Sequence, residues 1–504
     1  MLVKTAFICY NNGIGNSGLL FPNIFLIYRE AYSMLEELSP KRVFHYFEKI
    51  CSVPHGSGNT GKISEFCAAF AEEHGLWYKK DSLNNIIIKK KASAGYEEHP
   101  PVILQGHMDM VCEKTPDCDI DFKKDGLRLR LEGDMLSADG TTLGADDGIA
   151  VAMILAVLED DRLPHPPVTA VFTVDEEVGM DGAQALDVSS LGASTLINLD
   201  SGVEGVITAG CAGGAKSDIS IPVNFEKNNI PCLKISLGGL LGGHSGVDIN
   251  KGRQNACKLL AQLLCSIPEE FRLISFGGGF KDNVIPNACE CVIACGNAAA
   301  VRECAEKFAK ESVLPTDSGL KIEVNSLPAV ETRLDVSSHN AVLGFLSEVK
   351  SGVIAMEPEN PQFVKSSQNL GITNIENGCF NAVISVRSSA GAEKEEMLSA
   401  LRTLAGKFGA DFSTHGCYPA WEYRRNSRLR DVCVKAYKEQ SGAEPAVKTI
   451  HAGLECGLFC EKMPDFDAVS IGPDMWDIHT VNERLSVLST ERTYNYLCKI
   501  LKEL

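Results

Sequence analysis

Residues 101–109 read PVILQGHMD, an almost wholly apolar run that ends in a histidine and an acid. Such a run predicts a strand in the middle of a sheet, because a strand covered on both faces loses the alternation of apolar and polar side chains. Residues 167–174, PVTAVFTV, and 194–200, STLINLD, have the same character. Between the first two runs lies 148–158, GIAVAMILAVL, which is too apolar for a surface helix and should be buried. Strands that alternate with helices predict an α/β fold, with a mostly parallel sheet and helices on both of its faces.

The middle of the chain has a different pattern, with shorter strands and more polar helices. Residues 231–325 contain an alternating strand–helix module, and 339–420 resemble a second one. We therefore expect an inserted α+β domain with a doubled module at 214–419. The sheet domain would then be formed by residues 34–213 and 420–504.

The first residues differ from the rest. A helix is predicted shortly after Met34, with Ser39 as its cap and Pro40 at its first position. We expect Met34 to be the natural start and residues 1–33 to be a non-native or disordered extension.

Composition excludes two classes of partner. The chain has 504 residues, is 44% hydrophobic and carries a net charge of -18. The length and the apolar content suffice for cores in two domains. No stretch dense in lysine and arginine occurs, which argues against a nucleic-acid partner. The best apolar stretch, 18–28, is broken by Pro22 and is shorter than the ~20 residues of a membrane helix, so no membrane partner is expected.

The cysteines indicate a reducing compartment. There are 19 of them, an odd number, and no Cys-x-x-Cys pair occurs. In a chain of this length they are expected to act as small core residues, which predicts a cytoplasmic protein.

The residues suited to metal or acid–base chemistry follow the predicted strands. They are His107 and Asp109 after the first run, Glu176 and Glu177 after the second, and Asp200 at the end of the third. In an open α/β sheet the carboxyl ends of the parallel strands form one edge, and sites form there. The order of these residues therefore predicts that their side chains converge.

His107 and Asp109 suit a metal ligand and its support. Positions two apart on an extended strand face the same way, and a metal-bound histidine commonly donates its other ring N–H to a carboxylate. For this pair alone, the alternative is a buried histidine bonded to a nearby acid.

Each acidic cluster also has a structural alternative. Asp146 and Asp147 precede the apolar helix, where one carboxylate would either bridge two cations or cap the helix. Residues 175–177, DEE, repel one another beside a buried strand unless a cation is bound, or else form a solvated turn. Asp200 would be a ligand or the start of a turn, and His479 offers a second imidazole from a polar loop. Nitrogen and carboxylate ligands without thiolate suit two Zn²⁺ ions, with Mn²⁺ or Co²⁺ able to substitute.

A set of motifs from about residue 34 to the C-terminus carries a family resemblance. The motifs are HMDMV at 107–111, ADGTTLGADDGIA at 138–150, DEEVGM at 175–180, NLDS at 198–201, GGHSG at 242–246 and HAGLECG at 451–457. With them the sequence resembles the dizinc metallopeptidases that include aminoacylases, carboxypeptidase-like enzymes and cytosolic dipeptidases. Within that group it is most similar to the aminoacyl-histidine (Xaa-His) dipeptidases.

The resemblance implies a ligand set for two zinc ions. Asp146 would bridge the ions, with His107 and Asp200 on one of them and Glu177 and His479 on the other. The peptide bond that follows Asp146 would be cis. Residues 34–213 and 420–504 would be the dizinc catalytic domain, and 214–419 its lid.

The resemblance also implies the catalytic residues. Asp109 would orient the metal-ligating histidine, and Glu176 would be the general base for a water that bridges the zinc ions. His244, from the inserted domain, would stabilise the oxyanion. Asp147 and Asp175 have no direct role in this scheme.

The substrate would be held by four further residues. Arg387 would bind the terminal carboxylate of a peptide through its two-pronged guanidinium. The substrate pocket would be completed by His451, Gly453 and Glu455.

The implied function is metal-dependent hydrolysis of dipeptides, including Xaa-His dipeptides. The alternatives are an N-acyl amino acid deacylase, an aminopeptidase that acts on longer peptides, or a metal-bound peptide-binding protein without catalysis. The implied partner is a small peptide, and the sequence leaves both a monomer and a homodimer open.

Overall fold

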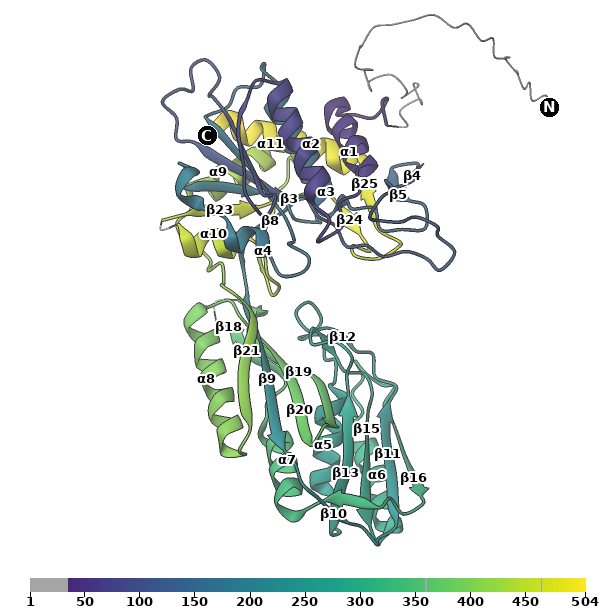
Figure 1. Ribbon diagram of the computed structural model, residues 1–504. Coiled ribbons are helices and arrows are strands. Elements are labelled where there is room, and N and C mark those ends of the chain that lie inside the picture. Colours follow the sequence, from purple (N-terminus) through teal and green to yellow (C-terminus); the bar gives the residue numbers. More distant parts are fainter. Residues whose placement is uncertain (1–34, 359, 464) are drawn as a thin grey trace, which may run out of the picture.

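The computed structural model describes residues 35–358, 360–463 and 465–504, so the N-terminal extension expected at 1–33 lies outside the described residues. Two large sheets dominate this part of the chain and lie at opposite ends of an elongated molecule (Figure 1). We call the eight-stranded sheet, at the top of Figure 1, sheet A, and the nine-stranded one sheet B.

Sheet A is parallel at its centre. Its strands, in spatial order, are β1 (Trp77–Lys80), β2 (Ile86–Lys90), β6 (Val168–Thr173), β3 (Val102–His107), β7 (Thr195–Asn198), β23 (Asp467–Ser470), β8 (Val206–Cys211) and β22 (Ala446–Ile450). The four strands from β6 to β23 run parallel, whereas β1 and β2 add antiparallel pairs at one edge. The expected mostly parallel sheet is therefore confirmed where the candidate site residues lie.

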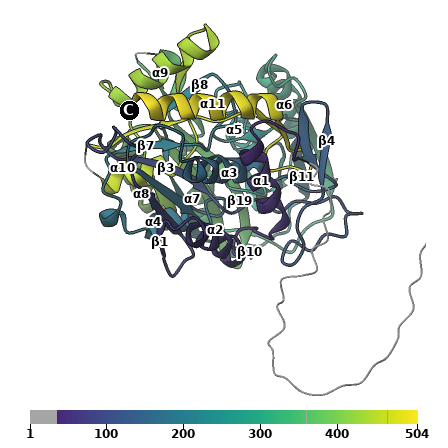
Figure 2. The same cartoon turned by 90° about the horizontal axis from the view of Figure 1, so that it is seen from above.

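Helices cover both faces of sheet A, as predicted. One face carries α1 (Lys41–Ser52), α2 (Gly61–Glu73), α3 (Ala145–Glu159), α9 (Arg428–Ser441) and α11 (Val487–Glu503), several of which lie over the strands in the view from above (Figure 2). The other face carries α4 (Asp181–Ala185), the 3₁₀ turn at Val188–Ser190 and α10 (Cys456–Lys462). Helix α3 is buried almost throughout, as its apolar sequence predicted.

Helix α1 differs from the prediction at its start. It begins at Lys41, and no side chain caps its first turn. The predicted cap by Ser39 is therefore wrong, because the Ser39 hydroxyl instead donates to a carboxylate oxygen of Glu491 at 2.6 Å.

Sheet B consists of two similar halves that meet edge to edge between β13 and β19. The first half is β11 (Cys232–Gly238), α5 (Ala256–Ser266), β13 (Phe271–Gly278), β15 (Cys289–Cys295), α6 (Ala298–Ser312) and β16 (Lys321–Leu327). The second half is β9 (Gly213–Pro222), α7 (Val336–Glu348), β19 (Asn360–Glu376), β20 (Cys379–Ser388), α8 (Gly391–Lys407) and β21 (Asp411–Tyr418), with β18 (Gly352–Glu357) paired to β19. Each half has the strand–helix–strand–strand–helix–strand order of a split βαβ unit. The expected doubled α+β module is thus confirmed, although β9, β13, β18, β19 and β21 were not predicted, and β9 lies outside the range 339–420 expected for the second module.

Short strands complete the fold. They are β10 (Phe225–Lys227) with β17 (Thr332–Leu334), β12 (Gly243–His244) with β14 (Val284–Ile285), and a small sheet of β4 (Leu129–Glu132), β5 (Met135–Ala138), β24 (Met475–Trp476) and β25 (Arg484–Ser486). Each large sheet has its own hydrophobic core, and helices α5 to α8 belong to that of sheet B.

The chain crosses between the sheets at two adjacent points. Cys211 ends the last sheet A strand before the crossing, and Trp421 follows the last strand of sheet B. The two residues bond to each other through both backbone groups, at 2.9 and 3.1 Å. The two connections therefore form one short double bridge, visible between the bodies in Figure 1.

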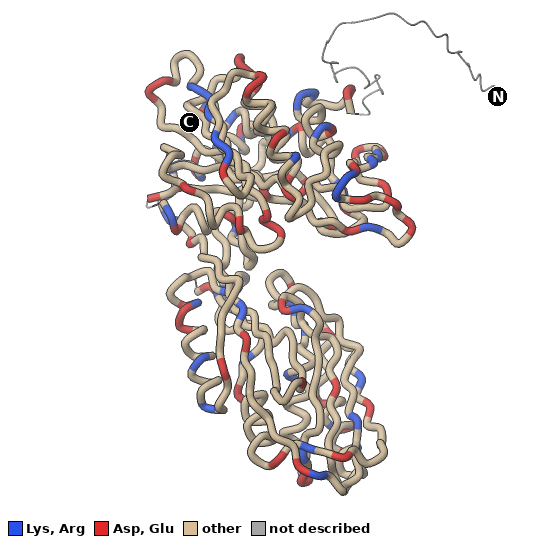
Figure 3. The backbone as a smooth tube through the Cα atoms, in the orientation of Figure 1, with Lys and Arg blue, Asp and Glu red and all other residues tan. Residues whose placement is uncertain are grey.

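Charged residues of both signs are interspersed over both bodies of the described chain (Figure 3). Among the described helices, none combines the length and the apolar content needed to cross a membrane.

Candidate active site

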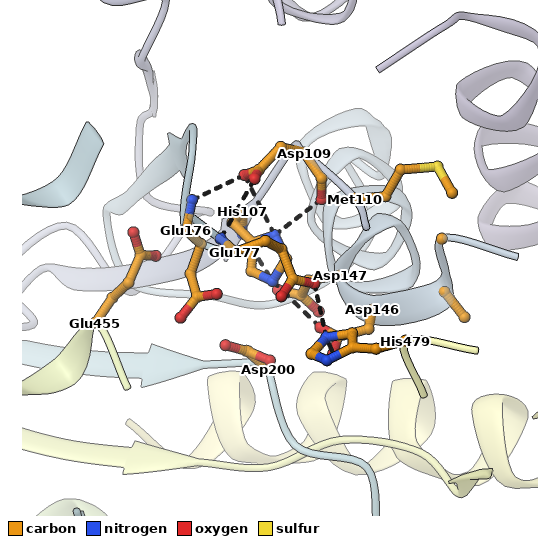
Figure 4. Close-up of polar contacts among 12 residues, drawn as sticks. His107, Asp109, Met110, Asp146, Asp147, Glu176, Glu177, Asp200, Glu455 and His479 are labelled. Atoms are coloured by element: carbon orange, nitrogen blue, oxygen red, sulfur yellow. Dashed lines mark hydrogen bonds and ion pairs between the residues drawn. The ribbon is translucent and has the colours of Figure 1, made fainter. Parts of the chain in front are cut away.

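Five of the predicted residues meet at the carboxyl edge of sheet A (Figure 4). His107 is the last residue of β3, Glu177 lies shortly beyond β6, and Asp200 lies just past β7. Asp146 comes from the start of α3, and His479 comes from the loop between β24 and β25. The strands deliver three of the groups because their parallel arrangement brings their carboxyl ends together.

The carboxylate of Asp146 lies between the two histidines. Its Oδ1 is 3.2 Å from Nε2 of His107, and its Oδ2 is 3.2 Å from Nε2 of His479. His479 Nε2 also lies 2.8 Å from Oε1 of Glu177. Burial lowers the pKa of His479, but the carboxylates of Asp146 and Glu177 outweigh this effect and raise it to about 10. The pocket thus has a strongly negative potential that favours bound cations.

His107 is supported from behind by Asp109. Nδ1 of His107 lies 3.0 Å from the backbone carbonyl of Asp109 and 3.6 Å from its carboxylate. The Asp109 carboxylate itself accepts hydrogen bonds from the backbone of Glu176, at 3.1 Å, and from the hydroxyl of Ser57, at 2.8 Å. Nε2 of His107 is thereby left to face the pocket, which is the arrangement of a metal-ligating histidine.

A second group of candidate ligands includes Asp147, which the sequence interpretation had set aside. Donor atoms of His107, Asp147 and Asp200 lie within 4.8 Å of one another, as do those of His107, Asp146 and Glu177. Oδ2 of Asp147 accepts from the backbone of His107 at 3.2 Å, while its Oδ1 is buried without a hydrogen-bond partner. Burial and the neighbouring Asp146 and Asp147 raise the pKa of Asp200. Buried carboxylates this close, one of them with an orphaned oxygen, are the environment that a divalent cation stabilises.

The Asp146–Asp147 peptide bond is cis, as the family resemblance implied. Glu483, which the sequence analysis missed, binds the segment that leads to this bond. Asp175 stands apart from the pocket, because its carboxylate accepts the backbone N–H of Gly58 at 2.6 Å.

Glu176 has the ionisation of a general base or acid. Burial raises its pKa to about 8, and the negative charges of Glu455, Glu177 and Asp146 act in the same direction. A carboxyl group with a pKa near neutrality can both take up and release a proton at physiological pH.

His244 lies on the short strand β12, in the inserted part of the chain. Its Nδ1 accepts hydrogen bonds from the backbone N–H groups of Gly246 and Val247, both at 3.2 Å. The neutral ring therefore carries its proton on Nε2, which is free to donate. Burial, followed by the positive charges of Arg387 and His479, lowers the pKa of His244 and so favours this neutral form.

The loop of His244 packs directly on the part of the chain that carries His451. A Cβ atom added to Gly246 would lie 2.5 Å from the carbonyl oxygen of His451. His451 Nε2 in turn bonds to the hydroxyl of Ser367 at 2.7 Å. Burial and the charge of Arg387 lower the pKa of His451 to about 4, so this ring is neutral.

The remaining predicted pocket residues take different positions. Arg387, on β20, donates from Nη1 to the hydroxyl of Tyr418 at 2.8 Å. Gly453 lies against the ring of the same tyrosine. Glu455 is fully buried beside Glu176 (Figure 4), where the hydroxyl of Thr173 donates to it at 2.6 Å and burial raises its pKa to about 7. Its burial does not match the predicted position in the wall of the substrate pocket.

Comparison with known proteins gives a consistent result. A model of the family described as "Peptidase family M20/M25/M40" matches residues 103–503. The cytosol non-specific dipeptidase of Escherichia coli (strain K12) is 35% identical over 483 residues, which cover 94% of this chain and 99% of that protein.

Two solved structures extend the comparison. The aminoacylhistidine dipeptidase from Vibrio alginolyticus superposes with a TM-score of 0.86 at 31% identity, covering 94% of this chain and 98% of that one. The aminopeptidase PepT from Bacillus cereus has a TM-score of 0.55 at 17% identity, covers 92% of this chain and 99% of its own, and shows the fold alone. The family match across most of the chain and the full-length relative establish that this chain belongs to peptidase family M20/M25/M40.

Proposed function

We propose that this chain is a metal-dependent dipeptidase whose substrates include Xaa-His dipeptides. The observation that carries the proposal is the position of Asp146, whose two carboxylate oxygens each lie 3.2 Å from a histidine nitrogen, one on His107 and one on His479. A carboxylate that faces two imidazoles in opposite directions suits a bridge between two cations. The Escherichia coli and Vibrio relatives carry the names of dipeptidases, which favours the same reaction here.

Two metal ions fit the donors that surround Asp146. His107 and Asp200 would hold one ion, Glu177 and His479 the other, and Asp146 both. Nitrogen and carboxylate donors without thiolate suit Zn²⁺, with Mn²⁺ or Co²⁺ as substitutes. When bound, such ions polarise a peptide carbonyl and make water easier to deprotonate.

Glu176 would move the proton. Its buried carboxyl group, with a pKa raised to about 8, would take a proton from the attacking water and deliver it to the leaving amine. Asp109 would hold Glu176 in position relative to His107. Its carboxylate binds the backbone of Glu176, while its backbone carbonyl and its carboxylate both face His107.

Residues of the inserted part of the chain and of the segment after β22 would complete the pocket. The Nε2–H of His244 would donate to the oxyanion that forms from the scissile carbonyl. Arg387 would bind the peptide's terminal carboxylate, with His451 and Gly453 beside it. For Glu455 we propose a supporting role under the ligands, since it is fully buried.

The same scheme assigns different functions to two domains. Residues 34–213 and 420–504 would form the catalytic domain, and 214–419 a lid that closes over a short peptide. Such a pocket favours dipeptides over long chains. We also propose a cytoplasmic location, because the 18 described cysteines are all free and the Escherichia coli relative is named for the cytosol.

A substrate panel tests the function. Metal-free protein would be reconstituted with Zn²⁺, Mn²⁺ or Co²⁺ and given Xaa-His and other dipeptides, tripeptides and N-acetyl amino acids. We expect dipeptides to be cleaved fastest, with activity that a chelator removes. Faster cleavage of N-acetyl amino acids would identify a deacylase, and faster cleavage of tripeptides an aminopeptidase. Peptide binding without any cleavage would identify a binding protein.

A further inference from the structure

Tyr418 shares a face of sheet B with the predicted carboxylate-binding arginine. Strands β19, β20, β9 and β21 run side by side (Figure 1). Across them Ser367 pairs with Arg387, Arg387 with Gly214, and Gly214 with Tyr418. Residues paired directly across strands project to the same side of a sheet. The side chains of Ser367, Arg387 and Tyr418 therefore project from the same face of sheet B, and Gly214, which has no side chain, lies between Arg387 and Tyr418.

A β-bulge places Tyr418 in this row. Between His415, which pairs with Lys216, and Tyr418, which pairs with Gly214, strand β21 advances three residues while β9 advances two. Because of the extra residue, each side chain after the bulge projects from the face of the sheet opposite to the one it would otherwise occupy. Gly416, inside the bulge, has a φ of 56°, a left-handed conformation that glycine adopts without strain. Without the bulge, Cys417 would stand opposite Gly214 and the tyrosine would project from the opposite face.

Two glycines make room for the tyrosine. A Cβ atom on Gly214 would overlap the hydroxyl end of the Tyr418 ring. A Cβ atom on Gly453, which comes from the sheet A side, would lie 2.8 Å from Cε2 of the same ring. The ring is therefore held between the two bodies of the molecule, and its hydroxyl is directed across Gly214 toward Arg387.

Arg387 lacks an anionic partner within the described chain. Its one hydrogen bond runs from Nη1 to the Tyr418 hydroxyl at 2.8 Å, and its Nε is buried without a partner. No carboxylate in the described residues lies within ion-pair distance of it. A guanidinium in a half-buried site needs such a partner. Because the tyrosine hydroxyl accepts from Arg387, its own proton is free to be donated to the same anion.

We propose that Tyr418 is a specificity-determining residue, which fixes the guanidinium of Arg387 and donates its own O–H to the free carboxylate of a bound peptide. The inference rests on the proposed function for the identity of the ligand as a peptide. It adds to that function a two-point recognition of the carboxylate, so that peptides ending in an amide are selected against.

The test is Tyr418→Phe, which removes only the hydroxyl. KM and kcat would be measured for a dipeptide acid and for the corresponding C-terminal amide. Dissociation constants for both would be measured by calorimetry in a Glu176→Gln background, where turnover should be strongly slowed. We expect the KM and the Kd of the acid to rise roughly 10- to 100-fold, the effect of losing a hydrogen bond to a charged group, with kcat within about twofold. Values for the amide should hardly change.

Two further variants guard against a merely structural effect. Gly214→Ala retains the hydroxyl but displaces the ring, so it should reproduce the weaker binding of the acid. Tyr78→Phe removes an exposed hydroxyl that donates to Glu72 at 2.6 Å, and it should behave as wild type. Metal content and thermal melting of the Tyr418→Phe protein should match wild type.

The outcomes separate this inference from the proposed function. Equal losses on acid and amide, an unchanged affinity for the acid, or a loss confined to kcat would each overturn the role of Tyr418. Wild-type protein that binds acid over amide but cleaves neither would contradict the dipeptidase function and leave the carboxylate recognition standing.

Discussion

The carboxylate of Glu483 accepts a hydrogen bond from the backbone N–H of Asp146 at 3.3 Å. The same carboxylate binds the three preceding backbone N–H groups, of Leu143, Gly144 and Ala145, at 2.8 to 3.1 Å. Glu483 follows His479 by four residues. One buried side chain therefore fixes the proposed bridging ligand in relation to the His479 loop, although the two segments are more than 300 residues apart in the chain.

We expect Glu483→Gln to weaken metal binding. The amide has one acceptor oxygen, and its NH₂ group would face two backbone donors, so half of the contacts become repulsive. Loss of such a supporting group around metal ligands costs about 10- to 100-fold in affinity or activity. Metal content by mass spectrometry and kcat should fall together. Glu444→Gln, at an exposed ion pair with Lys438, serves as the control. Full metal occupancy with normal kcat would show that this contact does not position Asp146.

Glu176→Gln and Glu177→Gln should fail in different ways. The first removes the proposed proton carrier, so kcat should fall about 10²- to 10⁴-fold with metal retained. The second removes a proposed ligand that lies 2.8 Å from His479, so metal content itself should fall. Comparing metal stoichiometry with turnover for the two neighbours distinguishes the roles. Normal turnover in Glu176→Gln would contradict its assignment as the base.

His244→Ala should reduce turnover without loss of metal. The ring lies on β12 with Nε2–H as its free donor, so in the proposed mechanism its removal deprives the oxyanion of one hydrogen bond. Loss of an oxyanion donor typically costs about 10²- to 10³-fold in kcat. His415→Ala, at an exposed histidine paired with Asp218, should leave turnover unchanged. If both variants retain full activity, His244 does not belong to the catalytic site.

The sequence predicted those helices and strands that are marked by the residues of one continuous segment. The strand ending at His107 and the buried helix α3 are marked by runs of apolar residues. The ligands follow because parallel strands end at one edge. Strand β21 of sheet B exposes most of its residues, so the apolar signal that marks sheet A is weak there. Strand β21 was accordingly missed.

The residues missed at the site depend on long-range contacts. The carboxylate of Glu483 binds backbone N–H groups of a loop that is more than 300 residues away in the sequence. The residues next to Glu483 in the sequence do not indicate this contact. Tyr418 reaches Arg387 only because a bulge reverses its face. Glu455 is fully buried, and its carboxylate contacts Gln105 and Thr173, on strands far away in the sequence, which its own motif does not encode.

Sheet B should lose local stability in mild acid because of His339. This ring lies on α7, is 6% exposed, and accepts the backbone N–H of Leu273 on β13 at 3.2 Å. Burial, and then the charge of Arg272, lower its pKa to about 4, below the 6.5 of an exposed histidine. Between these values the unfolded chain binds a proton that the folded chain excludes, so stability falls as the pH drops from about 6.5 toward 4. The full effect is on the order of 3 kcal/mol.

Hydrogen exchange can detect this change where it occurs. Peptides that cover Phe271–Gly278 should exchange faster at pH 5 than at pH 7.5, after correction for the intrinsic dependence of exchange on pH. His339→Asn keeps an acceptor for the amide of Leu273 but does not titrate, so it should remove most of this difference. Strand β3 of sheet A, which lies in a separate core, provides the internal reference. The hypothesis requires that protonation of the His339 imidazole destabilises β13. The same pH response in His339→Asn as in wild type would therefore assign the effect to other groups.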